Sequence, residues 1–338
     1  MRYLSTVYVR DHRARVGYRR GSLMVNQESG ATRIPLAAID AVVLLGAGQV
    51  TSDALAQCVK RGVRVASLRR SGALRFVVGG PISGNVHLRM AQHAAVVSEE
   101  RSLAIARAVV AAKLQSSRTM LLRWSRDAKS ASRRQGLQRR AEMIAERIAS
   151  VAGTDSGDHL RGLEGDAARI YFRGLGQHLS EIGLRFSART RRPPRDPVNA
   201  LMSFCYGLLT AELVGSINAV GLDDQLGFLH RPRSGRPSLA LDLAEELRPL
   251  ADRFAVAMLK RRQLGSVHFV KTPGGAVYLA DDGRDMVLKS WEAHKETPIF
   301  HSILRRPVER WALPTVQATL LARHLRGDLR LYPPFVLR

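Results

Sequence analysis

Four ionisable residues in two distant blocks of the chain have the types needed for a divalent-metal site. Glu164 stands between two glycines in GLEGDAARIYF, residues 162–172, at the start of an expected amphipathic helix. His230, Asp242 and Glu245 lie in a second block, GLDDQLGFLHRPRSGRPSLALDLAEELRP. Imidazole and carboxylate ligands suit Mn²⁺ or Mg²⁺ and leave open positions for water and phosphate oxygens. Beside a phosphodiester, such an ion polarises the phosphoryl group and stabilises the leaving oxygen, so the pattern predicts nuclease or strand-transfer chemistry.

Each of these residues also has a simpler interpretation when it is taken alone. His230 fits a loop histidine satisfied by its neighbours, and Asp242 fits a surface charge on a helix. Glu164 fits a surface glutamate in a first helical turn, where it favours the macrodipole. The two glycines beside Glu164 cost roughly 1 kcal/mol each within a helix, which favours close approach by another group. Only the combination of residues favours a metal site, because the blocks converge only if the chain folds back.

The overall charge indicates a polyanionic partner. The chain has 338 residues, of which 53 are Lys or Arg and 29 are Asp or Glu, giving a formal net charge of +24. Arg far outnumbers Lys, which favours bidentate contacts to phosphate. Nucleic acid is therefore the expected partner, and a merely solvated basic surface is the alternative.

Other bulk features indicate an intracellular globular protein. No run of about 18 apolar residues and no secretory signal occurs, so we expect a soluble, cytoplasmic protein without a membrane partner. Cys58 and Cys205 lie in apolar segments without metal-type spacing, and we interpret them as reduced core thiols.

The fold class predicted from hydrophobic periodicity is α+β, with two domains. Residues 1–85 are expected to form a small β-rich domain with one helix capped by Thr51, serving as a scaffold or dimerisation element. Residues 86–338 are expected to form a larger, mainly α-helical catalytic domain. The expected linker is glycine- and proline-containing: Gly79, Gly80, Pro81 and Gly84.

The catalytic domain contains several expected positioning elements. Residues 89–125 lack Pro and Gly and predict one helix, and residues 199–222 predict a central pair of packing helices. Residues 238–262 predict an amphipathic helix with a kink or break at Pro249. Asp242 and Glu245 share a face of that helix, and the adjacent Glu246 is not excluded as a ligand. A hairpin is expected within SVHFVKTPGGAVYLA.

Two basic segments are expected to contact DNA phosphates. Residues 101–140 contain eleven basic residues and one acid, Asp127, and RFSARTRRPPRD, residues 185–196, forms a basic loop. Further arginines follow His230 directly. The expected DNA contacts are Arg133, Arg134, Arg139, Arg140, Arg185, Arg189, Arg191, Arg192, Arg231 and Arg233.

The chain resembles the CRISPR-associated adaptation integrases, which are metal-dependent DNA endonucleases that install new spacers. The resemblance rests on GLEGDAARIYF, DPVNALMSFCYGLLTAEL, GLDDQLGFLH and PSLALDLAEELRPLADR. It implies that Glu164, His230 and Glu245 are the metal ligands, and that Asp242 either coordinates the metal or orients a ligand. It also implies an N-terminal β-domain followed by a helical catalytic domain.

The same resemblance implies a reaction and partners. A prespacer 3′-hydroxyl attacks a repeat phosphodiester in a transesterification that needs no ATP. The implied assembly is a heterohexamer, in which two homodimers flank a dimer of a small ferredoxin-like adaptation protein and hold double-stranded DNA. Two alternatives are a stand-alone, structure-selective nuclease for branched or repair DNA and a non-catalytic nucleic-acid-binding scaffold.

Overall fold

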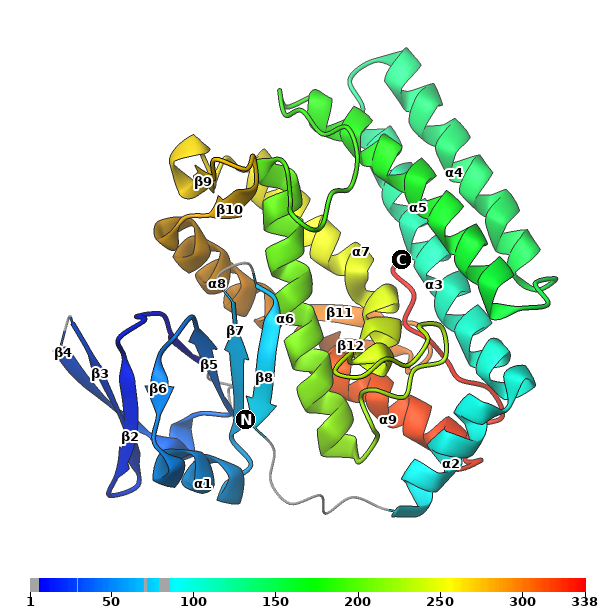
Figure 1. Ribbon diagram of the computed structural model, residues 1–338. Coiled ribbons are helices and arrows are strands. Elements are labelled where there is room, and N and C mark those ends of the chain that lie inside the picture. The colour runs from blue at the N-terminus through cyan, green and yellow to red at the C-terminus, as the bar shows by residue number, and fades with distance from the viewer. Residues whose placement is uncertain (1–5, 29, 70–71, 79–85) are drawn as a thin grey trace.

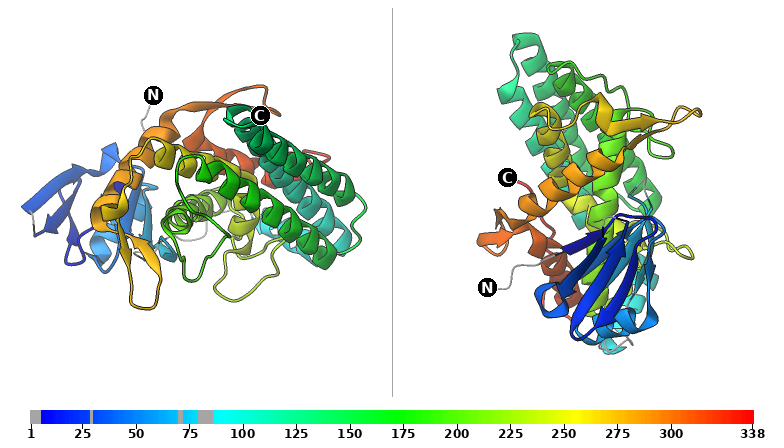
Figure 2. Two further views of the ribbon diagram at one scale, coloured as in Figure 1. Left: turned by 90° about the horizontal axis from the view of Figure 1, so that it is seen from above. Right: turned by 90° about the vertical axis from the view of Figure 1, so that its left-hand side faces the viewer.

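The structure is a computed structural model that describes residues 6–28, 30–69, 72–78 and 86–338 (Figure 1). An N-terminal strand-rich region precedes a larger region made mainly of helices (Figure 1 and Figure 2), which confirms the predicted α+β class. The expected linker residues Gly79, Gly80, Pro81 and Gly84 lie outside the described residues. The boundary between residues 1–85 and 86–338 therefore stays a prediction.

Two four-stranded sheets form the N-terminal region. The first has the order β1 (Thr6–Val9), β5 (Ala41–Leu45), β7 (Arg64–Leu68) and β8 (Leu74–Val78). The second has the order β4 (Gly30–Pro35), β3 (Ser22–Gln27), β2 (Arg15–Arg19) and β6 (Gln49–Val50). A short 3-10 helix, η1 (Leu36–Ala38), follows β4. Strands β1, β5 and β7 run parallel, which requires crossovers, and α1 (Ser52–Lys60) connects β6 to β7. As predicted, Thr51 caps α1 through its hydroxyl.

One face of the first sheet packs against the helical region. Leu45 and Leu68 belong to the large helical core, whereas Val42 and Val65 belong to a smaller core within the strand-rich region. Alternation along each strand explains this division, because neighbouring side chains point to opposite faces of a sheet. The Tyr8 hydroxyl also donates a 2.6 Å hydrogen bond to a glutamate, Glu292, of the helical region.

The helical region contains eight of the described α-helices and two β-hairpins. The helices are α2 (Val86–Val97), α3 (Glu99–Asp127), α4 (Ala131–Val151), α5 (Gly157–Ser180), α6 (Pro197–Val220), α7 (Ser238–Lys260), α8 (Asp281–Glu296) and α9 (Leu313–Leu325). The hairpins are β9 (Phe269–Lys271) with β10 (Val277–Leu279), and β11 (Pro298–His301) with β12 (Arg306–Glu309). Two short 3-10 helices, η2 (Ser266–His268) and η3 (Arg310–Ala312), precede β9 and α9. The predicted hairpin corresponds to β9 and β10, whereas the second hairpin was not predicted.

Three local predictions are corrected. Residues 197–220 form one helix, α6, instead of a pair, and Gly207 within it allows close packing: a Cβ there would lie 1.8 Å from the backbone oxygen of Gly72. Residues 89–125 are divided between two helices, because Ser98 is extended and its hydroxyl caps α3. Helix α7 runs unbroken through Pro249.

Helix α6 is long and apolar enough to cross a membrane by length and composition, and it is the one such helix among the described residues. In the fold, 67% of its most apolar window is buried. It lies centrally in Figure 1 and carries the buried thiol of Cys205, while Cys58 is buried in α1. Both cysteines are free, as predicted. These features are those of a core helix.

Helices α3 and α7 lie side by side and run in the same direction. Lys113 of α3 contacts Glu245 of α7, and further along Asp127 lies 3.6 Å from Lys260. The register between the helices is thus nearly constant. We call the side of this pair that carries Lys113 and Glu245 the metal-site side; α5 covers it there.

The C-terminal segment packs against another side of the same helix pair, which we call the tail side. The backbone N–H of Leu337 donates to Ser116 Oγ of α3 at 3.0 Å. The backbone N–H of Phe335 and the Tyr332 hydroxyl donate to Glu246 of α7 at 2.8 and 2.6 Å. Adjacent residues of α7, Glu245 and Glu246, therefore serve different sides because they are separated by about 100° around the helix.

Candidate metal centre and DNA-binding surface

Asp242 holds His230 in one orientation. The Asp242 side chain is 1% exposed and accepts hydrogen bonds from the backbone N–H groups of Phe228, Leu229 and His230 at 2.5, 3.0 and 3.0 Å. His230 Nδ1 lies 2.7 Å from Asp242 Oδ1. Because an ionised carboxylate only accepts, Nδ1 carries the proton and Nε2 keeps its lone pair. That Nε2 atom faces Glu245 Oε1 at 3.9 Å.

The loop that carries His230 is fixed from several elements. A Cβ at Gly227 would lie 2.8 Å from Asp242 Oδ2, so only glycine allows the loop to approach α7 this closely. Arg161 of α5 donates to the Leu229 carbonyl at 2.8 Å. Gln92 of α2 accepts from the backbone N–H of Asp223 at 2.9 Å. The position of His230 therefore depends on three helices.

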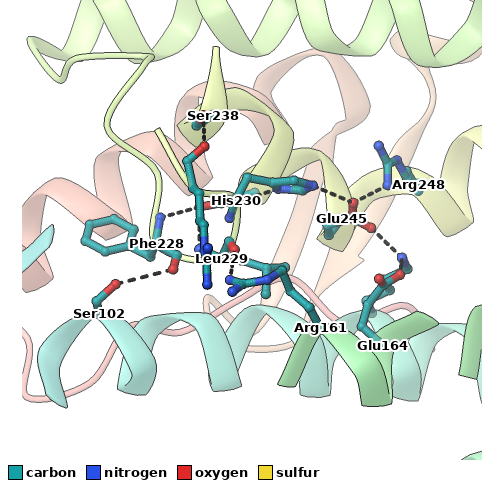
Figure 3. A network of polar contacts seen from close by, with 12 residues as sticks. Ser102, Arg161, Glu164, Phe228, Leu229, His230, Ser238, Glu245 and Arg248 are labelled. Atoms are coloured by element: carbon teal, nitrogen blue, oxygen red, sulfur yellow. Dashed lines mark hydrogen bonds and ion pairs between the residues drawn. The ribbon is translucent and has the colours of Figure 1, made fainter. Parts of the chain in front are cut away.

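Lys113 lies between the two candidate carboxylate ligands. Its ammonium group contacts Glu164 Oε1 and lies 2.5 Å from Glu245 Oε2. Arg248 forms an ion pair with the other Glu245 oxygen. Burial opposes ionisation of Glu245, but the positive charges of Arg248 and Lys113 outweigh it and lower its pKa to about 2. Figure 3 shows His230, Glu164 and Arg248 converging on Glu245.

The donors present fit a hard divalent cation. Glu245 Oε2 is buried, and the group that it contacts is itself a cation, the Lys113 ammonium at 2.5 Å. A cation, the Lys113 ammonium, already bridges the carboxylates of Glu164 and Glu245. Within the described residues, no three His, Cys, Asp or Glu side chains are already grouped as a metal site. A metal held by all three predicted ligands requires Lys113 to move aside.

A small cavity adjoins this arrangement. Its lining includes Lys113, Arg248, Tyr206, Asp252 and the loop arginine Arg191. Asp252 accepts hydrogen bonds from the hydroxyls of Tyr206 at 2.6 Å and Tyr171 at 3.0 Å. Burial raises the pKa of Asp252 to about 6, against the lowering effect of those hydrogen bonds. The basic loop thus reaches the candidate site through Arg191.

Comparison with known proteins identifies the family. The sequence profile described as CRISPR associated protein Cas1 matches residues 7–293. The CRISPR-associated endonuclease Cas1 2 of Rhodospirillum rubrum is 40% identical over 345 residues, covering 98% of each chain. The CRISPR-associated endonuclease Cas1 1 of Moorella thermoacetica is 37% identical over 339 residues, covering 99% of each chain. The chain belongs to the CRISPR-associated Cas1 family.

Solved structures agree with the Cas1 fold. A Cas1 protein from Thermotoga maritima superposes with a TM-score of 0.82 at 22% identity, over 99% of this chain and 100% of that chain. A structure named casposase bound to integration product gives a TM-score of 0.84 at 21% identity, over 98% and 93% of the two chains. The predicted family, fold class and enzyme class are confirmed, since the Cas1 relatives are endonucleases. Such nucleases are generally metal-dependent.

Two expectations about the Cas1 glutamates are corrected. Glu164 lies well inside α5, which begins at Gly157, and not at the helix start. Apart from the adjoining residues and the nearby backbone of α5 itself, no atom of the described residues lies within 4 Å of a Cβ placed at Gly162 or Gly165. The glycines therefore border open space instead of a neighbouring protein group.

Glu246 faces the tail side and is fully buried. Besides the tail, Gln317 Nε2 donates to Glu246 at 2.7 Å. Burial raises the pKa of Glu246 to about 8, although these hydrogen bonds oppose the rise. We therefore take Glu246 as a structural residue and not as a ligand.

Some of the predicted DNA-binding arginines are exposed, whereas others bind groups within the protein. Arg189 donates to Asn199 Oδ1 at 2.8 Å and to Ser203 Oγ at 3.0 Å. Its guanidinium carbon lies 5.2 Å from the centroid of the Tyr206 ring. Arg140 donates to Gln177 Oε1 at 2.9 Å. These two are thus held within the fold. The exposed members are Arg134, Arg139, Arg185, Arg191, Arg192, Arg231 and Arg233.

The remaining predicted contacts are partly engaged. Arg133 is half-buried and lies 3.7 Å from Glu181, while exposed Arg231 forms an ion pair with Asp158. Both pairs reach the surface, where such pairs contribute little and exchange readily for phosphate.

Sequence reasoning did not find Lys113, Arg248 or Gln92. Lys113 was counted as part of a basic DNA-contacting face, yet its side chain is only 11% exposed. The available indication was its position, since it lies between Ala112 and Leu114 in the apolar stretch of α3. Arg248 follows Glu245 by three residues, a spacing that predicts a shared helical face.

Proposed function

We propose that the chain is a Mg²⁺- or Mn²⁺-dependent DNA endonuclease and integrase that inserts prespacer DNA into a CRISPR repeat array. Glu164, His230 and Glu245 hold the metal, and Asp242 orients His230. The observation that carries the proposal is the placement of Glu245: His230 Nε2 lies 3.9 Å from its Oε1, and the Lys113 ammonium lies between its Oε2 and Glu164. This fits the oxygen-rich, histidine-containing ligand sets that Mg²⁺ and Mn²⁺ accept.

The metal, when bound, supplies Lewis-acid polarisation of the phosphoryl group. The reaction joins the prespacer 3′-oxygen to a repeat phosphorus and breaks the bond between that phosphorus and the repeat's own 3′-oxygen. The leaving oxygen becomes a new 3′-hydroxyl, which takes up the proton that the prespacer hydroxyl loses. The number of phosphodiesters is unchanged, so no ATP is required. Arg191, in the lining of the adjoining cavity, is placed to bind a phosphate of the incoming strand.

Lys113 has a place in this proposal as an exchangeable cation. It neutralises Glu164 and Glu245 until metal binds, which limits the repulsion between two neighbouring carboxylates. Once displaced, its ammonium remains near the site and is available to a phosphate oxygen.

We further propose that the protein acts in the cytoplasm as a homodimer that binds double-stranded DNA. Two such dimers and a dimer of a small ferredoxin-like adaptation protein make a heterohexamer, and residues 1–85 serve self-association. A solved complex named Cas6-RT-Cas1–Cas2 supports an assembly of this kind, because its matching chain has a TM-score of 0.81 to this one.

The test is an integration assay with a duplex that has free 3′-hydroxyls. Glu164→Ala, His230→Ala and Glu245→Ala should each lower metal-dependent cleavage and strand transfer by more than about 100-fold, because even the loss of a residue that only orients a ligand typically costs 10–100-fold. Glu142→Ala, at an exposed position of α4, is the matched control. Glu246 is unsuitable as a control because it is buried.

The outcomes separate the alternatives. Cleavage without any strand transfer would indicate a structure-selective nuclease. DNA binding with no metal-dependent chemistry would indicate a scaffold. Activity close to that of the parent protein in folded Glu164→Ala or His230→Ala would remove the ligand assignment.

A further inference from the structure

A second cluster of cations lies on the tail side of the α3–α7 pair, away from the candidate metal site. Arg253 follows Glu246 by seven residues on α7, and Arg123 follows Ser116 by seven residues on α3. Seven residues are nearly two full turns, so both arginines share the helix faces to which the tail is bound. They therefore lie further along the same helix faces than the contacts to the tail.

Two further arginines come from elsewhere in the chain. Arg310 belongs to η3 and Arg261 directly follows α7. The positive charges of Arg310, Arg253 and Arg261 lower the pKa of His294. Those of Arg123 and Arg310 lower the pKa of Arg253. Helices α3 and α7, the residue after α7 and η3 thus bring four guanidinium groups into one electrostatic neighbourhood.

The protein supplies this cluster with no carboxylate partner among the residues that the structure describes. No ion pair joins Arg123, Arg253, Arg261 or Arg310 to an acid, and the nearby Asp127 lies 3.6 Å from Lys260. Arg310 donates to the Thr297 carbonyl at 2.7 Å, while its Nε is buried without a partner. Burial first, and then the charges of Arg123 and Arg310, lower the pKa of Arg253.

His294 shows the same excess of positive charge. Its ring packs 5.1 Å from that of Phe254, between centroids. Burial first, and then the charges of Arg310, Arg253 and Arg261, lower its pKa to about 4, so the imidazole is neutral near pH 7. Like charges gathered without counter-charges destabilise a fold unless an anion binds among them.

We propose that Arg123, Arg253, Arg261 and Arg310 form a second phosphate-binding site, which holds the backbone of duplex DNA on the tail side. Arg253 lies eight residues beyond Glu245, or about 12 Å along α7, so the site is separate from the metal centre. This inference rests on the proposed function, in which two DNA molecules must be held together for strand transfer. A contact remote from the reacting phosphodiester would hold an arm of one of them.

The test measures how the affinity of the full chain for a labelled duplex depends on salt, without divalent metal. The cluster variant is Arg123→Gln with Arg253→Gln and Arg310→Gln. If all three contact phosphates, the log–log salt slope should fall by roughly 2 to 3 units, since each contact contributes about 0.9. Arg123→Gln alone, at an exposed position, should lower the slope by about 0.9 without a risk to folding.

The matched control removes three exposed arginines whose side chains already have protein partners. Arg13, Arg33 and Arg326 bind Glu28, Ser22 and Asp328 respectively, and changing all three to Gln removes the same net charge. This control should leave the slope nearly unchanged. Equal slopes for the cluster variant and the parent, or an equal fall in the control, would overturn the proposal.

A second measurement tests whether the site binds a free anion instead of duplex DNA. Inorganic phosphate bound among the arginines would raise the pKa of His294, which the NMR signals of its ring protons report. A response of His294 to phosphate with no change of DNA salt slope would mean an adventitious ion only and would also overturn the proposal. Binding is measured without metal, so its result does not depend on integration activity. Glu164→Ala protein should therefore show the same salt slopes as the parent.

Discussion

The two sides of the α3–α7 pair use the same kinds of cation for different purposes. On the metal-site side, Lys113 and Arg248 are paired with Glu164 and Glu245, and the pKa of Glu245 is low as a result. On the tail side, the arginines near Arg253 have no carboxylate partner in the described structure, and the pKa of Arg253 is lowered instead. The comparison indicates that the acids, and not the cations, distinguish the two sites. Paired carboxylates favour a metal ion, whereas unpaired arginines favour phosphate.

The largest expected effect concerns the orientation of His230. Asp242→Asn keeps the shape of the side chain but replaces an acceptor with an amide donor that faces N–H groups. We expect Mn²⁺ affinity, measured by calorimetry, to fall by about 10- to 100-fold, because His230 loses its fixed tautomer. DNA binding without metal should keep its salt slope.

Asp223→Asn is a suitable control, since Asp223 belongs to the same loop but lies outside the His230 contacts. Unchanged Mn²⁺ affinity in a folded Asp242→Asn protein would mean that the metal-site side does not depend on this hydrogen bond.

The second prediction concerns the tail. Glu246→Ala should destabilise the protein by about 2 kcal/mol, roughly 30-fold in the unfolding equilibrium, because buried donors from Gln317, Tyr332 and Phe335 lose their acceptor. Thermal or denaturant unfolding measures this, and Glu142→Ala again serves as the control. A loss of metal affinity with no loss of stability would instead place Glu246 in the metal site.

The sequence predicts much of this architecture because local patterns determine it. Short runs of β-branched and apolar residues between turn residues indicated the N-terminal strands, Thr51 indicated the cap of α1, and the periodicity of residues 238–262 indicated α7. Glu164, His230 and Glu245 were selected by residue type and resemblance, and the fold brings them together. That they hold a metal stays a proposal.

Other features depend on tertiary contacts that no local pattern contains. The close packing of α6 against the strand-rich region depends on the approach of Gly207 to Gly72. Lys113 looked like one more basic residue until the packing of α5 placed Glu164 against it. Arg189 looked like a phosphate contact, but Asn199 and Ser203, which bind it, lie in α6. The division of arginines between the two sides of α3–α7 likewise follows from which elements pack on each side.

The smallest effect is expected for Lys113, the cation that the two carboxylates of the metal-site side share. Lys113→Met keeps the length and packing of the side chain but removes the ammonium that bridges Glu164 and Glu245. A metal no longer competes with that charge, so Mn²⁺ affinity should rise by roughly 10-fold, a modest value for the removal of one charge beside two ligands. Without metal, repulsion between the two carboxylates should lower the melting temperature, and Mn²⁺ should raise it more than in the parent. Arg253→Gln, which removes one positive charge from the tail side, should leave Mn²⁺ affinity unchanged. If Lys113→Met binds Mn²⁺ no more tightly than Arg253→Gln does, the ammonium does not compete with the metal, and the two carboxylates are not its ligands together.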